Sequence, residues 1–344
     1  MAAQYSSDAS LPSAGSTGRL GVMYLQRFWA RIRRETISAI HQELTADEQM
    51  SDQQLLHTLG LGTAETLRYL YFEKPDFTQF EEWVLAVNEG CLNEAAIRSF
   101  NEWIENKSNE QFEQVMPGRV LDEQMWQCWQ TNGYVVVPGV ISPDDCRQTV
   151  SLINETIGAD PANPATWYHT TGREGIMVPL FRHSQVDKNR HAPLARMAFE
   201  EVWGRNNLLV NTDKTSFNPP AERGERMPVM HLHWDTSLAQ PIPFGTQGLI
   251  YLSDTTPAHG ALRLVPGFHL QIENWLNSLS PDLDPRQEDM EAFGAVAVPG
   301  QAGDLVIWHH ALPHAAGVNC ADRPRYVQYL NYAPATARAH PVWK

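Results

Sequence analysis

Residues 303–332 read GDLVIWHHALPHAAGVNCADRPRYVQYLNY, and an H-x-D tripeptide, His233-Trp234-Asp235, lies upstream of them. The segment alternates short apolar runs with turn residues, and similar runs recur from Leu208 onward. Such a density of short strands is typical of a double-sheet jelly roll. We therefore expect an α+β chain whose core is a double-stranded β-helix, the jelly roll, with flanking helices.

The H-x-D tripeptide has the spacing of two metal ligands on a strand. Residues i and i+2 of a strand point to the same face, so His233 and Asp235 can reach one metal while Trp234 points away. His314 lies 79 residues after Asp235 and must come from a distant strand, which a jelly roll brings close. Two imidazoles and one carboxylate are the ligand set of a non-haem Fe(II) site with open positions for a chelating co-substrate and O2.

Arg325 follows His314 by eleven residues. A guanidinium can grip a carboxylate as a bidentate fork, and 2-oxoglutarate carries a distal carboxylate of this kind. Arg323, two residues earlier on the same strand face, is the rival for this role.

Two further segments, GLIYLSDTTPAHGALRLVPGFH at 248–269 and WQTNGYVVVPGVISPDDC at 129–146, join the H-x-D and the 303–332 segment in one pattern. The pattern resembles the phytanoyl-CoA dioxygenase family of Fe(II)/2-oxoglutarate enzymes, from about residue 121 to 332. The resemblance implies a cupin-like jelly roll, bound Fe(II), 2-oxoglutarate and O2 as co-substrates, and His233, Asp235 and His314 as metal ligands. The family spacing favours Arg325 over its rival.

The chain departs from the family pattern at two positions. Phe268 replaces the serine of the usual PGSH turn, and Ala316 replaces a small polar residue two positions after the distal histidine. The second change removes one hydrogen bond to 2-oxoglutarate unless another residue replaces it.

Other pocket residues are expected around the same strands. Tyr251 stands where the family places an aromatic beside 2-oxoglutarate, although a core tyrosine is the alternative. His231 lines the substrate pocket, supports the metal ligands, or is an ordinary polar group. Arg263 either stabilises a turn or faces the substrate, and Asn218 and Lys214, on the strand before the H-x-D, are further pocket candidates.

The resemblance implies that the protein hydroxylates an unactivated C–H of a small molecule, such as an amino acid or a specialised-metabolite intermediate, with release of succinate and CO2. The same iron chemistry could instead give desaturation, cyclisation or epoxidation. A third alternative is a substrate tethered to coenzyme A, a carrier protein or a peptide. A fourth is a jelly roll that binds a ligand without turnover.

Composition excludes several classes of partner. A formal net charge of −14 and a pI near 5.3 argue against a nucleic-acid or anionic-membrane surface. The four cysteines have no C-x-x-C spacing, so neither a zinc site nor a disulfide framework is expected. The N-terminus lacks the pattern of a signal peptide, and no apolar run is long enough to span a membrane. We expect a cytoplasmic protein with a small-molecule substrate.

Three segments are expected along the chain: a flexible tail at 1–19, a helical subdomain at 20–118 and the jelly-roll dioxygenase domain at 119–344. Leu25, Trp29 and Ile32 recur at helical spacing in the second segment. Its basic cluster contains four arginines, namely Arg27, Arg31, Arg33 and Arg34. The cluster is either a solvated helix face or a docking face, and the subdomain is a candidate for homodimerisation or carrier docking.

Overall fold

The computed structural model describes residues 11–38, 45–106, 119–221, 231–334, 337, 340 and 342–344. It divides into two compact units: Met1–Glu113 with Pro334–Pro341, and Gln114–Ala333 with Val342–Lys344. The first ten residues of the expected tail, and the segment 107–118 at the expected domain boundary, lie outside the described residues.

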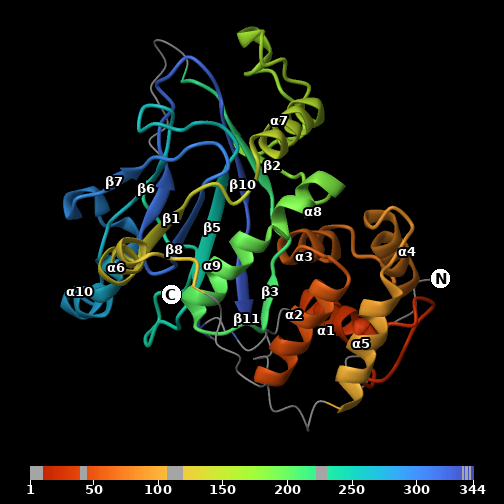
Figure 1. The fold of residues 1–344 in the computed structure, drawn as a ribbon. Coiled ribbons are helices and arrows are strands. Elements are labelled where there is room, and N and C mark those ends of the chain that lie inside the picture. Colours follow the sequence, from red (N-terminus) through yellow and green to blue (C-terminus); the bar gives the residue numbers. More distant parts are fainter. Residues whose placement is uncertain are drawn as a thin grey trace. The chain divides into compact units, whose positions relative to one another are not determined.

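The described part of the first unit is helical (Figure 1). Its helices are α1 (Leu25–Ser38), α2 (Ala46–Thr58), α3 (Thr63–Phe72), α4 (Phe77–Val87) and α5 (Glu94–Asn106). Apolar side chains from all five helices form one core, in which Phe28 stacks on Phe80 at 6.5 Å between ring centroids. The helical stripe beginning at Leu25 and Trp29 is buried in this core.

Two arginines of α1 are engaged inside this unit. Arg27 donates to Glu48 Oε1 at 2.8 Å, and Arg31, whose side chain is 5% exposed, pairs with Asp52. Because carboxylates of α2 already neutralise them, these two arginines do not supply free charge for a docking face. Docking of a carrier protein through the arginine cluster therefore remains a prediction, and the pairing of Arg27 and Arg31 gives it no support.

The second unit combines helices with three sheets, and the six-stranded and three-stranded sheets are antiparallel. Its helices are α6 (Glu123–Asn132), α7 (Pro143–Ile157), α8 (Ser184–Arg190), α9 (Pro193–Trp203) and α10 (Ile272–Ser278). The largest sheet has the order β1 (Tyr134–Val137), β8 (Leu305–His309), β5 (Thr246–Tyr251), β10 (Arg325–Tyr329), β4 (Thr215–Asn218) and β2 (Met177–Val178). The three-stranded sheet has the order β7 (Val296–Val298), β6 (Leu262–Leu264) and β9 (His314–Ala316). The two-stranded sheet pairs β11 (Tyr332–Pro334) with β3 (Leu208–Val210).

Alternation along β8 shows how the six-stranded sheet is covered on both faces. Leu305 and Ile307 join the core formed with α7 and α9, whereas Val306 and Trp308 join the core formed with β6, β7 and β9. Neighbouring residues of a strand point to opposite faces, so a strand buried on both sides is apolar throughout. The second unit is thus a mixed helix-and-sheet fold in which the three-stranded sheet packs on the face opposite these helices (Figure 1).

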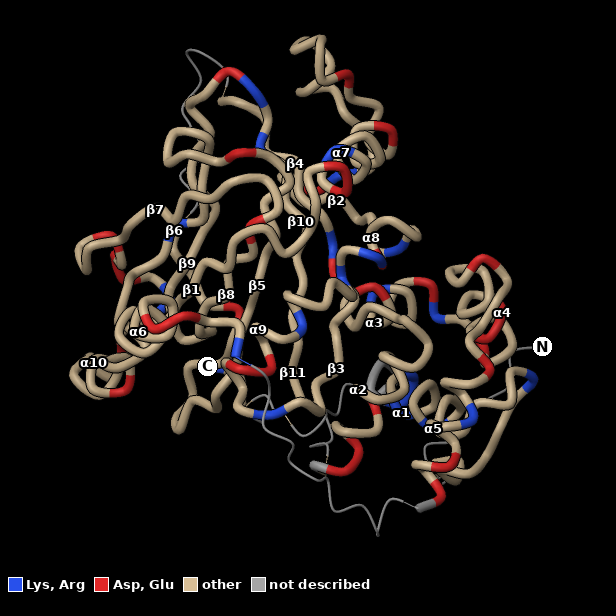
Figure 2. Tube along the Cα trace, viewed as in Figure 1, with Lys and Arg blue, Asp and Glu red and all other residues tan. Residues whose placement is uncertain are grey.

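Figure 2 shows acidic and basic residues interspersed over both units. Within the described residues, none of the helices combines the length and the apolar character that crossing a membrane requires.

Candidate metal and co-substrate site

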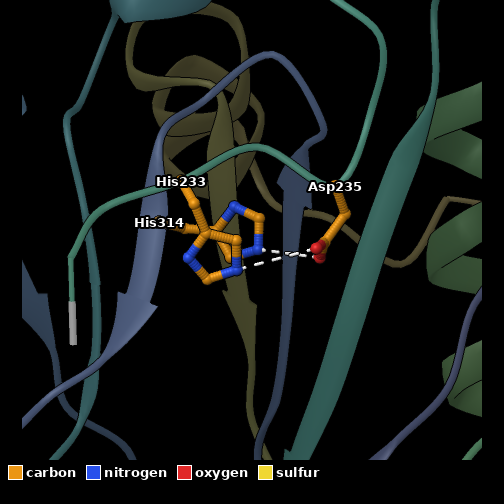
Figure 3. A group of neighbouring side chains, drawn as sticks. All are labelled: His233, Asp235 and His314. Carbon is orange, nitrogen blue, oxygen red and sulfur yellow. Dashed lines mark ion pairs between the residues drawn. The ribbon is translucent and has the colours of Figure 1, made fainter. Parts of the chain in front are cut away.

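The structure brings His233, Asp235 and His314 together (Figure 3). One ligand atom from each lies within 4.8 Å of the other two. His314 Nε2 is 3.3 Å from Asp235 Oδ2, and His233 Nε2 is 3.6 Å from Asp235 Oδ1. The side chains of His233 and Asp235 are 50% and 55% exposed, whereas that of His314 is 7% exposed. The cluster is therefore anchored in the core on one side and reachable from solvent on the other.

Both imidazoles are fixed by backbone carbonyls. The Nδ1 atoms of His233 and His314 lie 3.1 Å from the carbonyl oxygens of His231 and Leu312. A carbonyl only accepts, so each Nδ1 carries the proton and donates it. Each Nε2 is left to face Asp235, with its lone pair available to a metal when the ring is neutral.

The third member of the cluster, Asp235, is held by Gln247 on β5. Gln247 Nε2 donates to Asp235 Oδ2 at 2.7 Å, and its Oε1 accepts from the indole of Trp308 at 3.1 Å. When the His314 ring is protonated, its hydrogen bond through Nε2 lowers the pKa of Asp235 most; burial opposes it, and the hydrogen bond from Gln247 lowers the pKa as well. A carboxyl held ionised in this way is suited to a cation.

The H-x-D segment is less regular than the strand expected from sequence. His233 and His314 form an isolated bridge, with backbone hydrogen bonds of 3.0 and 2.9 Å, and Asp235 follows in a bend. Trp234 points away, as expected, and its indole donates to Ala311 O at 2.9 Å. Arg286 donates to the carbonyls of Trp234 and Thr236 at 2.8 and 2.7 Å, so side-chain contacts replace the missing strand pairing.

A cavity of about 380 Å³ opens beside the cluster. Its wall includes all three cluster residues and Arg325, the first residue of β10. Arg325 is 1% exposed; its Nη1 donates to Gly260 O, while its Nε and Nη2 have no hydrogen-bond partner among the described residues. Buried cationic donors left without an acceptor are costly, which points to an anionic ligand in the cavity. The rival Arg323 is exposed and donates to His259 Nε2 at 3.2 Å.

The cavity wall includes polar residues that were not identified from sequence. They are Asn211, Asp213, Gln247, Tyr329 and Asn331. Tyr329 was detectable in principle, because it lies four residues after Arg325 on one strand and so shares its face. The others lie at strand ends and in loops, where periodicity gives no direction. Lys214, a sequence candidate, does line the cavity.

Four predicted residues are not in the cavity wall. The Tyr251 hydroxyl is used between the two sheets: it donates to Val298 O at 2.7 Å and accepts from Leu262 N at 2.9 Å. The Asn218 amide donates to Gly317 O at 3.2 Å. Arg263 pairs with Glu291. His231 is exposed and lies outside any regular strand, so strand geometry does not direct its side chain to the same side as that of His233.

Comparison with known proteins assigns the chain to a family. The family model for phytanoyl-CoA dioxygenase (PhyH) matches residues 129–327, more than half of the chain. The chain therefore belongs to the phytanoyl-CoA dioxygenase family, a family of Fe(II)/2-oxoglutarate-dependent dioxygenases, and the resemblance noted from sequence is confirmed.

The relatives are distant. The peroxisomal phytanoyl-CoA dioxygenase of Rattus norvegicus is 23% identical over 237 residues, covering 61% of this chain and 68% of that protein. A Dictyostelium discoideum protein named for the same activity is 22% identical over 265 residues, covering 61% and 75%.

Solved structures also match. The non-haem α-ketoglutarate-dependent carbocyclase SnoK is 20% identical, with a TM-score of 0.47 and coverage of 66% of this chain and 90% of that one. The epimerase SnoN in complex with Fe3+, α-ketoglutarate and nogalamycin RO is 22% identical, with a TM-score of 0.45 and coverage of 64% and 86%.

Proposed function

We propose that this protein is an Fe(II)- and 2-oxoglutarate-dependent dioxygenase that hydroxylates an unactivated C–H of a small molecule and releases succinate and CO2. The observation that carries the proposal is the shared cavity: a cluster of two histidines and one carboxylate opens into the same space as a buried arginine with unpartnered donors. The family membership supports the same class of reaction.

The donor set fits Fe(II). His233, Asp235 and His314 would hold the metal on one face and leave the positions toward the cavity open. The backbone carbonyls that fix both rings and the Gln247 amide that holds Asp235 keep the ligands in place before the metal arrives. When bound, the iron supplies activation of O2 coupled to oxidation of 2-oxoglutarate.

Arg325 would bind the distal carboxylate of 2-oxoglutarate. Its Nε and Nη2 form one edge of the guanidinium group, and neither has a hydrogen-bond partner in the described part of the chain, whereas Nη1 donates to Gly260 O. A carboxylate on that edge would complete a bidentate pair in a place closed to water. Burial raises the pKa of the Tyr329 hydroxyl, so this group stays protonated as a hydrogen-bond donor in the wall of the same cavity.

We also propose that the six-stranded and three-stranded sheets form a jelly roll and that residues 119–344 are the catalytic domain. Desaturation or cyclisation would use the same ligands and differ only in how the substrate lies. A binding protein without turnover would not need a metal cluster and a carboxylate-binding arginine in one cavity.

The test adds Fe(II) and then 2-oxoglutarate to metal-free protein under anaerobic conditions. The measured quantity is the visible charge-transfer absorption of the resulting complex. We expect a band in the wild type, none in Asp235→Ala, and a Kd for 2-oxoglutarate about 10- to 100-fold higher in Arg325→Ala and Arg325→Lys, because charge-assisted hydrogen bonds are worth about 1.5–3 kcal/mol. Arg323→Ala, an exposed arginine two residues away, is the matched control and should bind normally.

A wild-type protein that gives no band under reducing conditions would contradict the proposal. If Arg323→Ala weakened binding and Arg325→Ala did not, the metal site would stand but the co-substrate arginine would be wrong. Succinate release with candidate substrates would then establish turnover.

A further inference from the structure

The cavity extends beyond the residues assigned to iron and 2-oxoglutarate. Arg325 and Tyr329 lie at the two ends of β10 and both line it. Four strand residues span about 13 Å, and Asn331, which also lines the cavity, lies further on. On the proposed function, 2-oxoglutarate occupies the Arg325 end, which leaves the Asn331 end for the substrate.

Two chain segments build that other end. Asn211, Asp213 and Lys214 come from the connection between β3 and β4, and Asn331 follows β10. The segments are tied by backbone hydrogen bonds: Asn211 N donates to Asn331 O at 2.7 Å, and Tyr329 N donates to Lys214 O at 3.0 Å. These polar side chains are therefore held on a fixed frame.

The two charged groups at this end have no ionic partner among the described residues. The Asp213 carboxylate accepts from the backbone N of Lys214 at 2.7 Å. The neighbouring guanidinium of Arg190 donates instead to the backbone carbonyl of Asp213, at 3.3 Å, and to the Asp187 carboxylate. Burial raises the pKa of Asp213, so the ionised form gains from any donor that a ligand brings.

Lys214 supplies the opposite charge. Within the part of the chain that the structure describes, its ammonium takes part in neither an ion pair nor a hydrogen bond, yet it lines the same cavity as Asp213. One carboxylate and one ammonium at the same end of a cavity complement a ligand that carries both charges.

We propose that this end of the cavity binds a zwitterionic substrate of α-amino acid size, with its ammonium on Asp213 and its carboxylate on Lys214. The inference rests on the proposed function, because it takes the Arg325 end as occupied by 2-oxoglutarate. Size agrees: about 380 Å³ is near the lower end of the ~300–1,000 Å³ typical of ligand pockets, and it must hold the co-substrate as well. A large acyl chain would find charged groups where it needs apolar ones.

The test uses protein loaded with 2-oxoglutarate and Ni(II), which takes the same imidazole and carboxylate ligands. Isothermal titration with the twenty common L-amino acids should identify at least one that binds. Asp213→Asn should raise its Kd at least tenfold, and Lys214→Met should do the same, because each removes one charged partner. Asp282→Asn, an exposed carboxylate change, is the matched control.

The matched deaminated acid of that amino acid gives the sharper comparison. Its Kd should respond to Lys214→Met and be the same in Asp213→Asn as in the wild type, since it has no ammonium to lose. Uptake of Ni(II) and 2-oxoglutarate without binding of any amino acid would overturn the inference and leave the proposed function intact. The same would follow if an amino acid bound with a Kd that neither Asp213→Asn nor Lys214→Met changed. Failure to take up Ni(II) and 2-oxoglutarate would remove the proposed function itself.

Discussion

Gln247 links the metal-ligand candidate Asp235 to the centre of the six-stranded sheet. Its amide donates to Asp235 Oδ2 at 2.7 Å and accepts from the Trp308 indole at 3.1 Å. Because Gln247 and Trp308 are register partners on β5 and β8, the sheet fixes the amide before it touches Asp235. Gln247 is thus a positioning residue for the carboxylate.

Gln247→Leu is expected to weaken Co(II) or Ni(II) binding by about 10- to 100-fold, the usual cost of losing a partner of a metal ligand. Trp308→Phe keeps an aromatic ring but removes the indole N–H that holds the Gln247 amide, so metal affinity should fall by a smaller factor. Isothermal titration of metal-free protein measures both. Exposed Gln287→Leu is the control; equal affinities in all three variants would show that Asp235 needs no such support.

At the scale of single residues, the sequence predicts the cluster better than its surroundings. The H-x-D spacing and the position of Arg325 select three residues, His233, Asp235 and Arg325, that line one cavity in the structure. Tyr251 has the right strand face, two residues after Leu249 in the cavity wall, but its hydroxyl bonds the backbone of β6 and β7. The face to which a side chain points follows from the two-residue alternation of a strand. Which residues on that face reach the cavity depends on where the second sheet packs.

At the scale of elements, most of the short strands follow from their composition, but the H-x-D strand does not form. One bridge between His233 and His314 and two hydrogen bonds from Arg286 hold the segment instead. Arg286 comes from the Pro- and acid-rich loop 281–291. A brace from so distant a loop is a tertiary contact that local patterns do not encode.

The turn before β6 is the element that orients Arg325. Gly260 has φ +71°, and its carbonyl accepts from Arg325 Nη1. A Cβ there would lie 2.6 Å from Gly317 O and 2.8 Å from Asn218 Nδ2. The turn therefore requires glycine on two grounds, backbone conformation and space.

Gly260→Ala is expected to destabilise the protein by about 1 kcal/mol or more and to raise the Kd for 2-oxoglutarate, with metal affinity kept. Gly294→Ala is the matched control, since Gly294 also has positive φ, +84°, but nothing lies within 4 Å of its Cβ position. Denaturation midpoints and titration with 2-oxoglutarate check both. If the two variants bound the co-substrate alike, the Gly260 carbonyl would have no part in orienting Arg325.

At the scale of the whole molecule, buried histidines outside the metal cluster are expected to make stability depend on pH. His309 packs on Trp129, with ring centroids 6.4 Å apart, and has His269 and His310 as neighbours. Burial, and then the charges of His310 and His269, lower the pKa of His309 from 6.5 to about 3. Burial lowers the pKa of His269 and of His310 as well.

The sign follows from proton binding. Below pH 6.5 the unfolded chain takes up a proton at His309 that the folded protein refuses until about pH 3, so stability falls as pH drops through this window and is fully present above 6.5. From pH 6.5 to 5 the loss for one such histidine is up to about 2 kcal/mol. His309→Gln removes the proton site, so its urea midpoint should fall less between pH 7 and 5 than that of metal-free wild type. Exposed His169→Gln should follow the wild type, and parallel curves for all three proteins would place the acid sensitivity elsewhere.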